Sequence, residues 1–344
     1  MKAAVWRQTG RFDIEEVPAP APAADEVVIK IEYCGVCGTD IHRAWTHGEM
    51  APGVVIGHEY CGRVTMVGSA AAKWKAGDRV VCASGIQETG SAAAAGAESP
   101  RQRFTPRLVA RTGAPGTVHQ GGFAEYKRIR AANILGIPDS IDDLTATLIE
   151  PCAIAVHAVE RAQIGAGERV GIIGLGPIGL LVAQVARAAG ALEVYGVDPS
   201  AVRRSAGLEV GCTAAYAPNE TDAVEALVSV TDGGPDVVFD CAAAATSLDD
   251  ALTATRAHGR VVLVGISWDR VTVTPVEWIG RNVEMRSMYA YSRAHCEAAL
   301  KLIAKGAIHS AEMIRPEWIF PLEGIHEAFE RSYRAELVKA VIRP

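Results

Sequence analysis

Short apolar runs separated by glycines dominate the first 150 residues. The segments 26–31 and 78–81 are two of them, and the pattern predicts a β-rich domain. From about residue 165 to 290, apolar runs of strand length alternate with amphipathic segments of helical length. This alternation is typical of a parallel sheet covered by helices on both faces, as in a doubly wound α/β domain. The predicted strands of that domain are 169–173, 194–197, 236–239 and 260–264, and its predicted helices include 178–189 and 221–230.

The last fifty or so residues are expected to return to the first domain. A helix is predicted over 294–305 and a final strand over 337–342, with its partner strand in the β-rich domain. The expected division is therefore a first domain at 1–152, completed by 293–344, and a doubly wound domain inserted at 153–292.

Composition supports two ordinary globular domains. The chain has 344 residues, of which 49% are hydrophobic and 22% are charged, enough for two cores. The net charge of −6, without a Lys/Arg-rich run, argues against nucleic acid as a partner and favours a small molecule. Neither a signal-peptide pattern nor an apolar stretch of about 18 residues is found, so we expect a cytoplasmic protein without a membrane partner. Eight scattered cysteines predict no structural disulfide.

A glycine motif follows the first predicted strand of the α/β region. Residues 174–179, Gly-Leu-Gly-Pro-Ile-Gly, fit G-x-G-x-x-G between a strand and a helix, the context that a dinucleotide site requires. Gly174 permits the tight turn, Gly176 lets the backbone approach a pyrophosphate, and Gly179 allows close packing of helix on strand. The predicted cofactor-binding residues are Gly174, Gly176, Pro177, Ile178, Gly179, Asp198 and Arg203.

Asp198 ends the strand after the motif and indicates which dinucleotide binds. A carboxylate there accepts hydrogen bonds from the ribose hydroxyls and repels a 2′-phosphate, which favours NAD over NADP. The neighbouring Arg203 and Arg204 act in the opposite direction. A glycine loop used only for packing is the alternative, and the order of strand, loop, helix and acid argues against it.

A second constellation lies in the β-rich region. It consists of Cys37-Gly-Thr-Asp-Ile-His42, Gly57-His58-Glu59 and Glu150-Pro151. The runs 57–62 (Gly-His-Glu-Tyr-Cys-Gly), 77–80 (Gly-Asp-Arg-Val) and 121–126 (Gly-Gly-Phe-Ala-Glu-Tyr) resemble the zinc-containing medium-chain dehydrogenase/reductase (alcohol dehydrogenase) family, nearest its polyol and butanediol dehydrogenase branch. The resemblance covers essentially the full length. It implies a GroES-like β-rich catalytic domain, a Rossmann domain, and assembly as a homodimer or homotetramer.

The same resemblance implies one catalytic zinc per chain. Its ligands would be Cys37, His58 and Glu150, with Glu59 as a ligand that exchanges with substrate or water. Thiolate, imidazole and carboxylate are all zinc donors, and three protein ligands leave the open position that catalysis needs.

Three further residues receive roles from the family. The hydroxyl of Thr39 would take the proton of the alcohol and pass it through the cofactor ribose to His42. Asp40 would orient the ligand His58 and fix its tautomer.

The chain departs from many relatives in the segment 83–120. Those relatives bind a structural zinc there through four cysteines, whereas the only cysteine here between Asp78 and Gly121 is Cys82, so no structural zinc is expected. Cys34 and Cys37 could form half of a zinc knuckle, but no second C-x-x-C completes it. The arginines of this segment are interpreted as a solvated face, with contact to a substrate phosphate or carboxylate as the alternative; they are Arg101, Arg103, Arg107 and Arg111.

The reaction implied is transfer of a hydride from a secondary alcohol of the diol, polyol or cyclitol type to NAD, which yields a ketone. Within the family, oxidation of L-threonine or another amino alcohol, or of a primary alcohol, stays open. A zinc-free quinone reductase and a non-catalytic NAD-binding sensor or scaffold are alternatives that the intact ligand set disfavours. The substrate depends on dispersed loops such as 45–50 and 288–291. The other histidines are interpreted as surface or core residues; they are His47, His119, His157, His258, His295, His309 and His326.

Overall fold

The computed structural model describes residues 1–46, 48, 50–83, 121–220, 222–267 and 269–344. It contains two compact units. The β-rich unit comprises Met1–Ile137, Phe320–Glu330 and Val341–Pro344, and the α/β unit comprises Pro138–Ile319 and Arg331–Ala340. The expected boundaries after 152 and 292 stay a prediction; by their contacts, residues 138–152, 293–319 and 331–340 group with the α/β unit.

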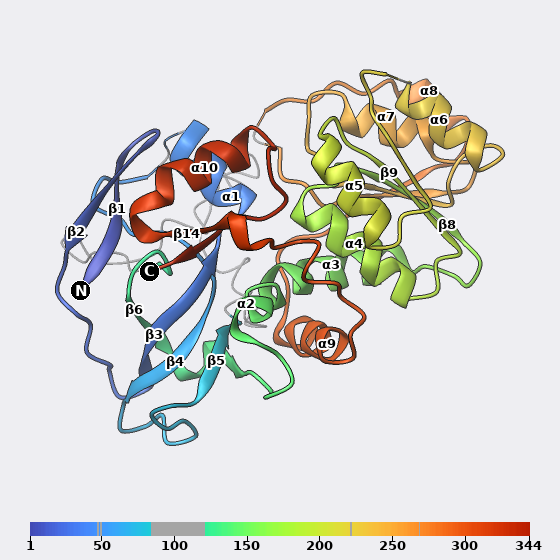
Figure 1. Cartoon of the computed structure of the whole chain (residues 1–344). Helices are drawn as coiled ribbons and strands as arrows, with labels where there is room; N and C mark the ends of the chain where they lie inside the picture. Colours follow the sequence, from blue (N-terminus) through green and yellow to red (C-terminus); the bar gives the residue numbers. More distant parts are fainter. Residues whose placement is uncertain (47, 49, 84–120, 221, 268) are drawn as a thin grey trace, which may run out of the picture. The chain divides into compact units, whose positions relative to one another are not determined.

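The β-rich unit is built on antiparallel pairing (Figure 1). β1 (Lys2–Gln8) and β2 (Arg11–Glu16) form a two-stranded sheet. A seven-stranded sheet has the order β14-β15-β3-β4-β5-β7, with β6 also paired to β3. Its strands are β3 (Glu26–Gly35), β4 (Glu59–Val67), β5 (Arg79–Cys82), β6 (Tyr126–Arg130), β7 (Ile134–Gly136), β14 (Ile319–Pro321) and β15 (Val341–Arg343). The predicted strands at 26–31 and 78–81 are confirmed to within one or a few residues.

The predicted final strand is partly wrong. Strand β15 covers only Val341–Arg343, and residues 337–340 form bends and irregular backbone. The expected partner is confirmed, since Val341 pairs with Gly35 of β3. The apolar run 337–342 was predicted as one strand, but its two halves are buried in different units. Leu337 and Val338 belong to the α/β unit, and Val341 and Ile342 belong to the β-rich sheet.

The α/β unit is a six-stranded parallel sheet in the order β10-β9-β8-β11-β12-β13, which is the Rossmann order. Its strands are β8 (Arg169–Ile173), β9 (Glu193–Val197), β10 (Ala214–Tyr216), β11 (Val237–Asp240), β12 (Arg260–Leu263) and β13 (Glu284–Ser287). Every residue of β11 is buried, as expected for a parallel strand covered on both faces. The predicted strands at 169–173, 194–197, 236–239 and 260–264 are confirmed within one residue.

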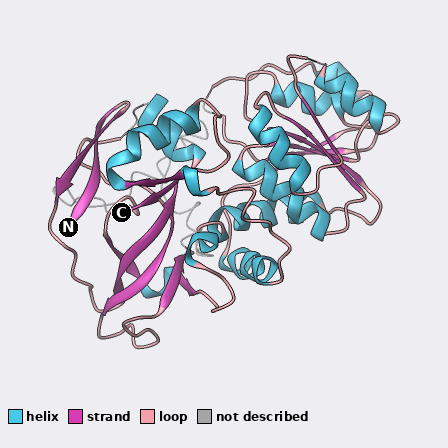
Figure 2. Ribbon diagram, in the orientation of Figure 1, coloured by secondary structure: helices cyan, strands magenta, loops and turns pink. Residues whose placement is uncertain are grey.

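Helices lie on both faces of this sheet (Figure 2). Helix α3 packs on β12 and β13, α4 on β8 and β9, and α7 on β11 and β12. The helices are α2 (Asp143–Ala146), α3 (Ile149–Ala162), α4 (Pro177–Ala188), α5 (Ala201–Glu209), α6 (Ala223–Val230), α7 (Ser247–Ala254), α8 (Pro275–Ile279) and α9 (Arg293–Ala304), and α10 (Ile325–Tyr333) runs from the β-rich into the α/β unit. Pro177 starts α4 at a position where its missing N–H costs nothing.

All eight cysteines are free thiols. No helix in the described part of the chain is long and apolar enough to cross a membrane.

Candidate active site

Antiparallel pairing brings the two parts of the candidate metal site together. The last residue of β3, Gly35, is registered opposite Glu59, the first residue of β4. Cys37 follows β3 by two residues and His58 immediately precedes β4, so side chains about twenty positions apart in sequence meet at one end of the strand pair. Gly57 turns the chain into β4 with a φ of +101°, and a Cβ there would lie 2.9 Å from the sulfur of Cys34. This crowding explains the glycine before His58.

The short helix α1 (Gly38–Ile41) presents a buried carboxylate to both ligands. Cys37 caps this helix, and its backbone N–H donates to Oδ2 of Asp40 at 3.2 Å, half of a capping box. Oδ1 of the same carboxylate lies 3.4 Å from Nδ1 of His58. Asp40 is 3% exposed. The predicted role of Asp40 as a partner of His58 therefore has a geometric basis.

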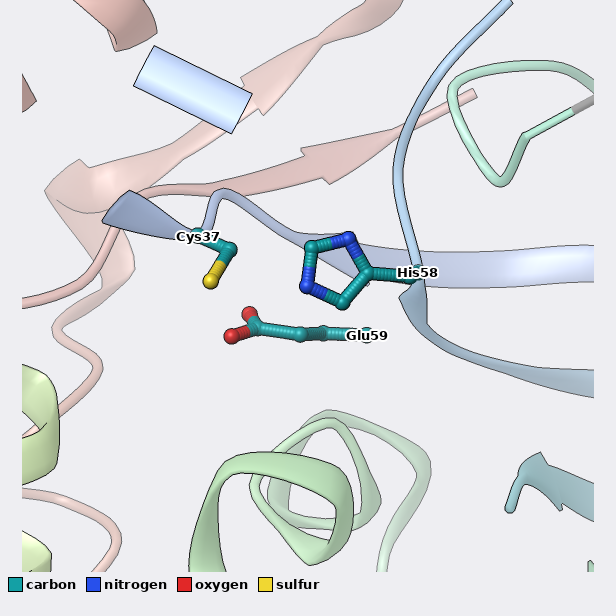
Figure 3. Close-up of side chains that lie close together, drawn as sticks. All are labelled: Cys37, His58 and Glu59. Atoms are coloured by element: carbon teal, nitrogen blue, oxygen red, sulfur yellow. The ribbon is translucent and has the colours of Figure 1, made fainter. Parts of the chain in front are cut away.

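Cys37, His58 and Glu59 form a cluster whose potential ligand atoms all lie within 4.8 Å of one another. Figure 3 shows the sulfur, one imidazole nitrogen and the carboxylate turned toward a common point. Because Asp40 lies beside Nδ1, Nε2 is the nitrogen left for a metal. A thiol, an imidazole and a carboxylate at these separations match the donor set of a zinc site.

The electrostatic environment of the Cys37, His58 and Glu59 cluster favours positive charge. Burial by itself lowers the pKa of His58, but Asp40 and Cys37 together hold this pKa well above the ordinary value for histidine. The negative charges of Asp40 and Cys37 that raise this pKa would also attract a metal cation, which has to replace the proton on the imidazole in order to bind. The donor set and the field thus both fit a divalent metal.

Thr39 and His42 lie next to the cluster in sequence. The hydroxyl of Thr39 is 3.4 Å from the sulfur of Cys37. His42 ends α1, where its backbone N–H donates to the carbonyls of Gly38 and Thr39, and it begins a π-helical turn, His42–Thr46. Such turns are rare and frequently occur at functional sites.

The glycine motif of the α/β unit has three distinct local environments. A Cβ on Gly179 would lie 1.9 Å from the carbonyl oxygen of Gly174, so this position requires glycine for packing. Gly174 has a φ of +93°, and a Cβ there would lie 2.8 Å from the backbone nitrogen of Ala242. At Gly176 the nearest atom to a Cβ is a guanidinium nitrogen of Arg203 at 3.7 Å, an ordinary contact. The fold therefore explains Gly174 and Gly179, whereas Gly176 keeps open space beside the N-terminus of α4.

Asp198 follows β9, next to β8 in the sheet. Its side chain is buried, and its two oxygens accept hydrogen bonds from the backbone N–H groups of Leu175 and Ser200, each at 2.8 Å. The carboxylate thus ties the glycine loop to the start of α5. Arg204 donates to the carbonyls of Asp198 and Pro199 at 2.8 and 2.9 Å.

Comparison with known proteins assigns both units. Residues 23–139 match the alcohol dehydrogenase GroES-like domain, and residues 177–305 match the zinc-binding dehydrogenase domain. Sorbitol dehydrogenase of Bacillus subtilis (strain 168) is 30% identical, across 100% of this chain and 97% of that protein. The chain belongs to the zinc-containing alcohol dehydrogenase family. It is therefore a dehydrogenase of the medium-chain dehydrogenase/reductase type.

Solved structures of this dehydrogenase family agree with the fold. The 2R,3R-butanediol dehydrogenase of Bacillus subtilis superposes with a TM-score of 0.84 at 28% identity, covering 100% of this chain and 99% of that one. A Sinorhizobium meliloti 1021 protein bound to NADP superposes with a TM-score of 0.85 at 32% identity, with the same coverage.

Glu150 belongs to the α/β unit, whereas Cys37, His58 and Glu59 belong to the β-rich unit. It occupies the first turn of α3, in the α/β unit, and is 7% exposed. The three side chains that the structure brings together are Cys37, His58 and Glu59, so the role of Glu150 as a ligand stays a prediction from the family pattern.

Sequence reasoning about this dehydrogenase missed Asp240. It ends β11, the strand beside β8, and is 4% exposed. Its Oδ1 accepts hydrogen bonds from the N–H groups of Ala242 and Ala243, both at 3.1 Å. Asp240 therefore shapes the loop against which Gly174 packs. The sequence does contain a pattern that could have identified Asp240. It follows the apolar run 237–239 just as Asp198 follows the apolar run 194–197.

His157, His295 and His326, three of the described histidines outside the cluster, have side-chain contacts of a structural kind. His157 and His295 stack with ring centroids 4.6 Å apart, and His295 pairs with Glu160 at 2.7 Å. Nε2 of His326 accepts the N–H of Phe12. The predictions for residues in the segment 84–120 lie outside the described residues; they concern Arg101, Arg103, Arg107, Arg111 and His119. His47 also lies outside the described residues.

Proposed function

We propose that this chain is a zinc- and NAD-dependent dehydrogenase that oxidises a secondary alcohol of the diol, polyol or cyclitol type to a ketone. The observation that carries the proposal is the cluster of Cys37, His58 and Glu59, braced by the buried Asp40. A packing role alone does not require a thiol, an imidazole and a carboxylate to converge within 4.8 Å.

One zinc ion per chain would be held by Cys37, His58 and Glu150, with Glu59 as the exchangeable ligand. When bound, zinc supplies Lewis acidity that lowers the pKa of an alcohol hydroxyl. The chain itself supplies the orientation: Asp40 holds Nδ1 of His58 and the N–H of Cys37, and thereby presents Nε2 and the sulfur together. No structural zinc is proposed, because Cys82 is the only cysteine between residues 78 and 121.

Proton removal is assigned to Thr39 and His42. The Thr39 hydroxyl lies 3.4 Å from the sulfur of Cys37, and therefore next to one of the proposed zinc ligands. In the proposed relay the Thr39 hydroxyl would accept the proton of the alcohol, and His42 would be the residue that finally receives it.

NAD is the proposed hydride acceptor. Asp198 places a buried carboxylate just after β9. There it would accept hydrogen bonds from the ribose hydroxyls of NAD and would repel a 2′-phosphate. Arg204, one of the two cations that argue for NADP, already donates to two backbone carbonyls. The proposed cofactor-binding residues are Gly174, Gly176, Pro177, Ile178, Gly179, Asp198 and Arg203.

The substrate class rests on relatives. The proteins most relevant here are named sorbitol dehydrogenase and butanediol dehydrogenase, and both names denote secondary alcohols with a neighbouring hydroxyl. Their identity to this chain, 30% and 29%, supports the class rather than one compound.

The decisive experiment measures formation of reduced cofactor with vicinal diols, polyols, cyclitols, threonine and simple alcohols, with NAD and NADP in parallel. Reduction of NAD by one polyhydroxy class, lost on treatment with a chelator and restored by zinc, is the expected result. Turnover of threonine but not diols would assign an amino-alcohol dehydrogenase. Binding of NAD without turnover would indicate a sensor, and turnover that survives metal removal would overturn the zinc mechanism. A cytoplasmic location and a dimer or tetramer remain predictions from the sequence.

A further inference from the structure

We propose that Ser200 is a positioning residue that sets the preference for NAD, by anchoring the Asp198 turn to the segment that follows α10. This inference rests on the proposed use of NAD. It concerns contacts within the α/β unit alone.

The first link joins Asp198 to Ser200. The backbone N–H of Ser200 donates to Oδ1 of Asp198 at 2.8 Å, while Oδ2 is held by the N–H of Leu175. Both carboxylate oxygens therefore have their directions set by backbone groups. Each oxygen keeps a second lone pair for a ribose hydroxyl. The direction of these lone pairs depends on where Ser200 lies.

The second link joins Ser200 to the end of the chain. Its hydroxyl donates to the carbonyl of Ala335 at 2.7 Å, across 135 sequence positions. A similar, longer bond joins Nε of Arg203 to the carbonyl of Leu337 at 3.4 Å. The start of α5 is thus attached to residues 335–337 at two points one helical turn apart.

The anchor itself is a well-defined turn. The N–H of Ala335 donates to the carbonyl of Ser332, and the N–H of Glu336 to that of Arg331, which closes the end of α10. Ala335 has a φ of +54°, a left-handed conformation that favours glycine. The turn holds the Ala335 carbonyl in the direction that the Ser200 hydroxyl needs.

Loss of this anchor should affect the two cofactors differently. NAD uses the Asp198 carboxylate as an acceptor for its ribose hydroxyls, so a less constrained carboxylate weakens NAD binding. A 2′-phosphate is repelled by the same carboxylate, so a looser turn does not weaken NADP binding. The signature of positioning is therefore a change in the ratio of the two affinities.

The test compares the wild-type protein with Ser200→Ala and Ser200→Thr, by titrating each with NAD and NADP and by measuring kcat at saturating cofactor. We expect S200A to raise the Kd for NAD about five-fold, the effect of one hydrogen bond. The Kd for NADP and kcat should stay unchanged, and S200T, which keeps a hydroxyl, should restore the wild-type ratio. Ser205→Ala is the matched control, because Ser205 lies on α5, the helix that Ser200 precedes, and its hydroxyl contacts only the nearby Glu209 among the bonds described.

Three results would overturn the inference. The first is an S200A protein whose ratio of Kd values for NAD and NADP equals that of the wild type. The second is an equal loss of affinity for both cofactors, and the third is a ratio that S200T does not restore. Each would show that Ser200 does not position Asp198. If S200A does not fold, Ser200→Cys, with its weaker donor, should give a smaller shift in the same direction. A wild-type protein that prefers NADP would instead refute the proposed use of NAD, and that result is visible before any variant is made.

Discussion

The carboxylate of Asp40 lies 3.4 Å from Nδ1 of His58 and also accepts the backbone N–H of Cys37. One buried side chain thus orients two members of the candidate zinc cluster. Such partners hold the ligand histidine in the tautomer that leaves its other nitrogen for the metal.

Replacement of Asp40 by asparagine should therefore weaken zinc binding while the fold is kept. The amide side chain of D40N would retain an oxygen for the Cys37 N–H but lose the negative charge beside His58. We expect zinc affinity to fall by about 10–100-fold, measured by competition with a chromogenic chelator. Asp13→Asn, at a carboxylate that pairs with Arg11 on the surface, is the control and should bind zinc normally. Equal affinity in D40N and the wild type would contradict the role of Asp40.

Thr39→Val should separate proton removal from metal binding. Valine has nearly the same shape but no hydroxyl, so zinc content and the Kd for NAD should be unchanged. We expect kcat to fall by about 10²–10⁴-fold, the usual contribution of a general base, in steady-state assays with the preferred alcohol. Thr39→Ser keeps the hydroxyl and should stay within a few-fold of wild type. Substantial kcat in T39V would remove Thr39 from the relay.

The glycines of the motif should respond differently to alanine. Gly176→Ala adds a methyl group that lies at an ordinary van der Waals distance from Arg203. The free energy of unfolding should therefore change by no more than about 0.5 kcal/mol. The same methyl group would occupy the space proposed for the pyrophosphate, so we expect NAD affinity to fall at least tenfold, measured by fluorescence titration.

Gly174→Ala serves as the comparison. Its Cβ would lie 2.8 Å from a backbone nitrogen, in a left-handed conformation, so the variant should lose about 1–3 kcal/mol of stability as well as NAD binding. If G176A were destabilised as much as G174A, Gly176 would be a packing residue rather than part of the cofactor site.

Glu168→Gln should destabilise the α/β unit in a way that depends on pH. Glu168 accepts hydrogen bonds from both terminal nitrogens of Arg260 and from the N–H of Gly165. Burial raises the pKa of Glu168, but Arg260 and the Gly165 N–H outweigh it and lower this pKa. We expect E168Q to lower the free energy of unfolding by about 1–3 kcal/mol near neutral pH.

The sign of the pH dependence follows from the lowered pKa. The stabilisation is fully present above the unfolded-state pKa of glutamate, about 4.3, and is lost as pH falls through the still lower value in the folded protein. Urea titrations of wild type and E168Q should therefore converge at acid pH. Glu284→Gln, at an exposed carboxylate paired with Arg286, should change stability by no more than about 1 kcal/mol. A difference between wild type and E168Q that does not shrink on acidification would exclude the ion pair as its source.

Some elements escaped prediction for a physical reason. Strands β10 and β13 lie at the two edges of the parallel sheet, and neither strand contains a fully buried residue. An edge strand with few buried side chains carries little hydrophobic signal. The run 337–342 carried a strong signal that was misassigned, because an apolar run shows that residues are buried but not in which core.

The sequence by itself determined the fold class, the four inner strands of the Rossmann sheet, the glycine motif and the donor residues Cys37, His58 and Glu59 that the structure brings together. These features follow from local requirements. Parallel strands buried on both faces need apolar runs, positions where a Cβ has no room need glycine, and a metal site needs thiol, imidazole and carboxylate side chains. Only the tertiary structure decided which of those residues meet. The register of β3 against β4 brings Cys37 to Glu59, and the return of the chain to the α/β unit brings Ala335 to Ser200. Such contacts depend on strand register and on chain paths over a hundred residues long, and no local pattern in the sequence encodes either one.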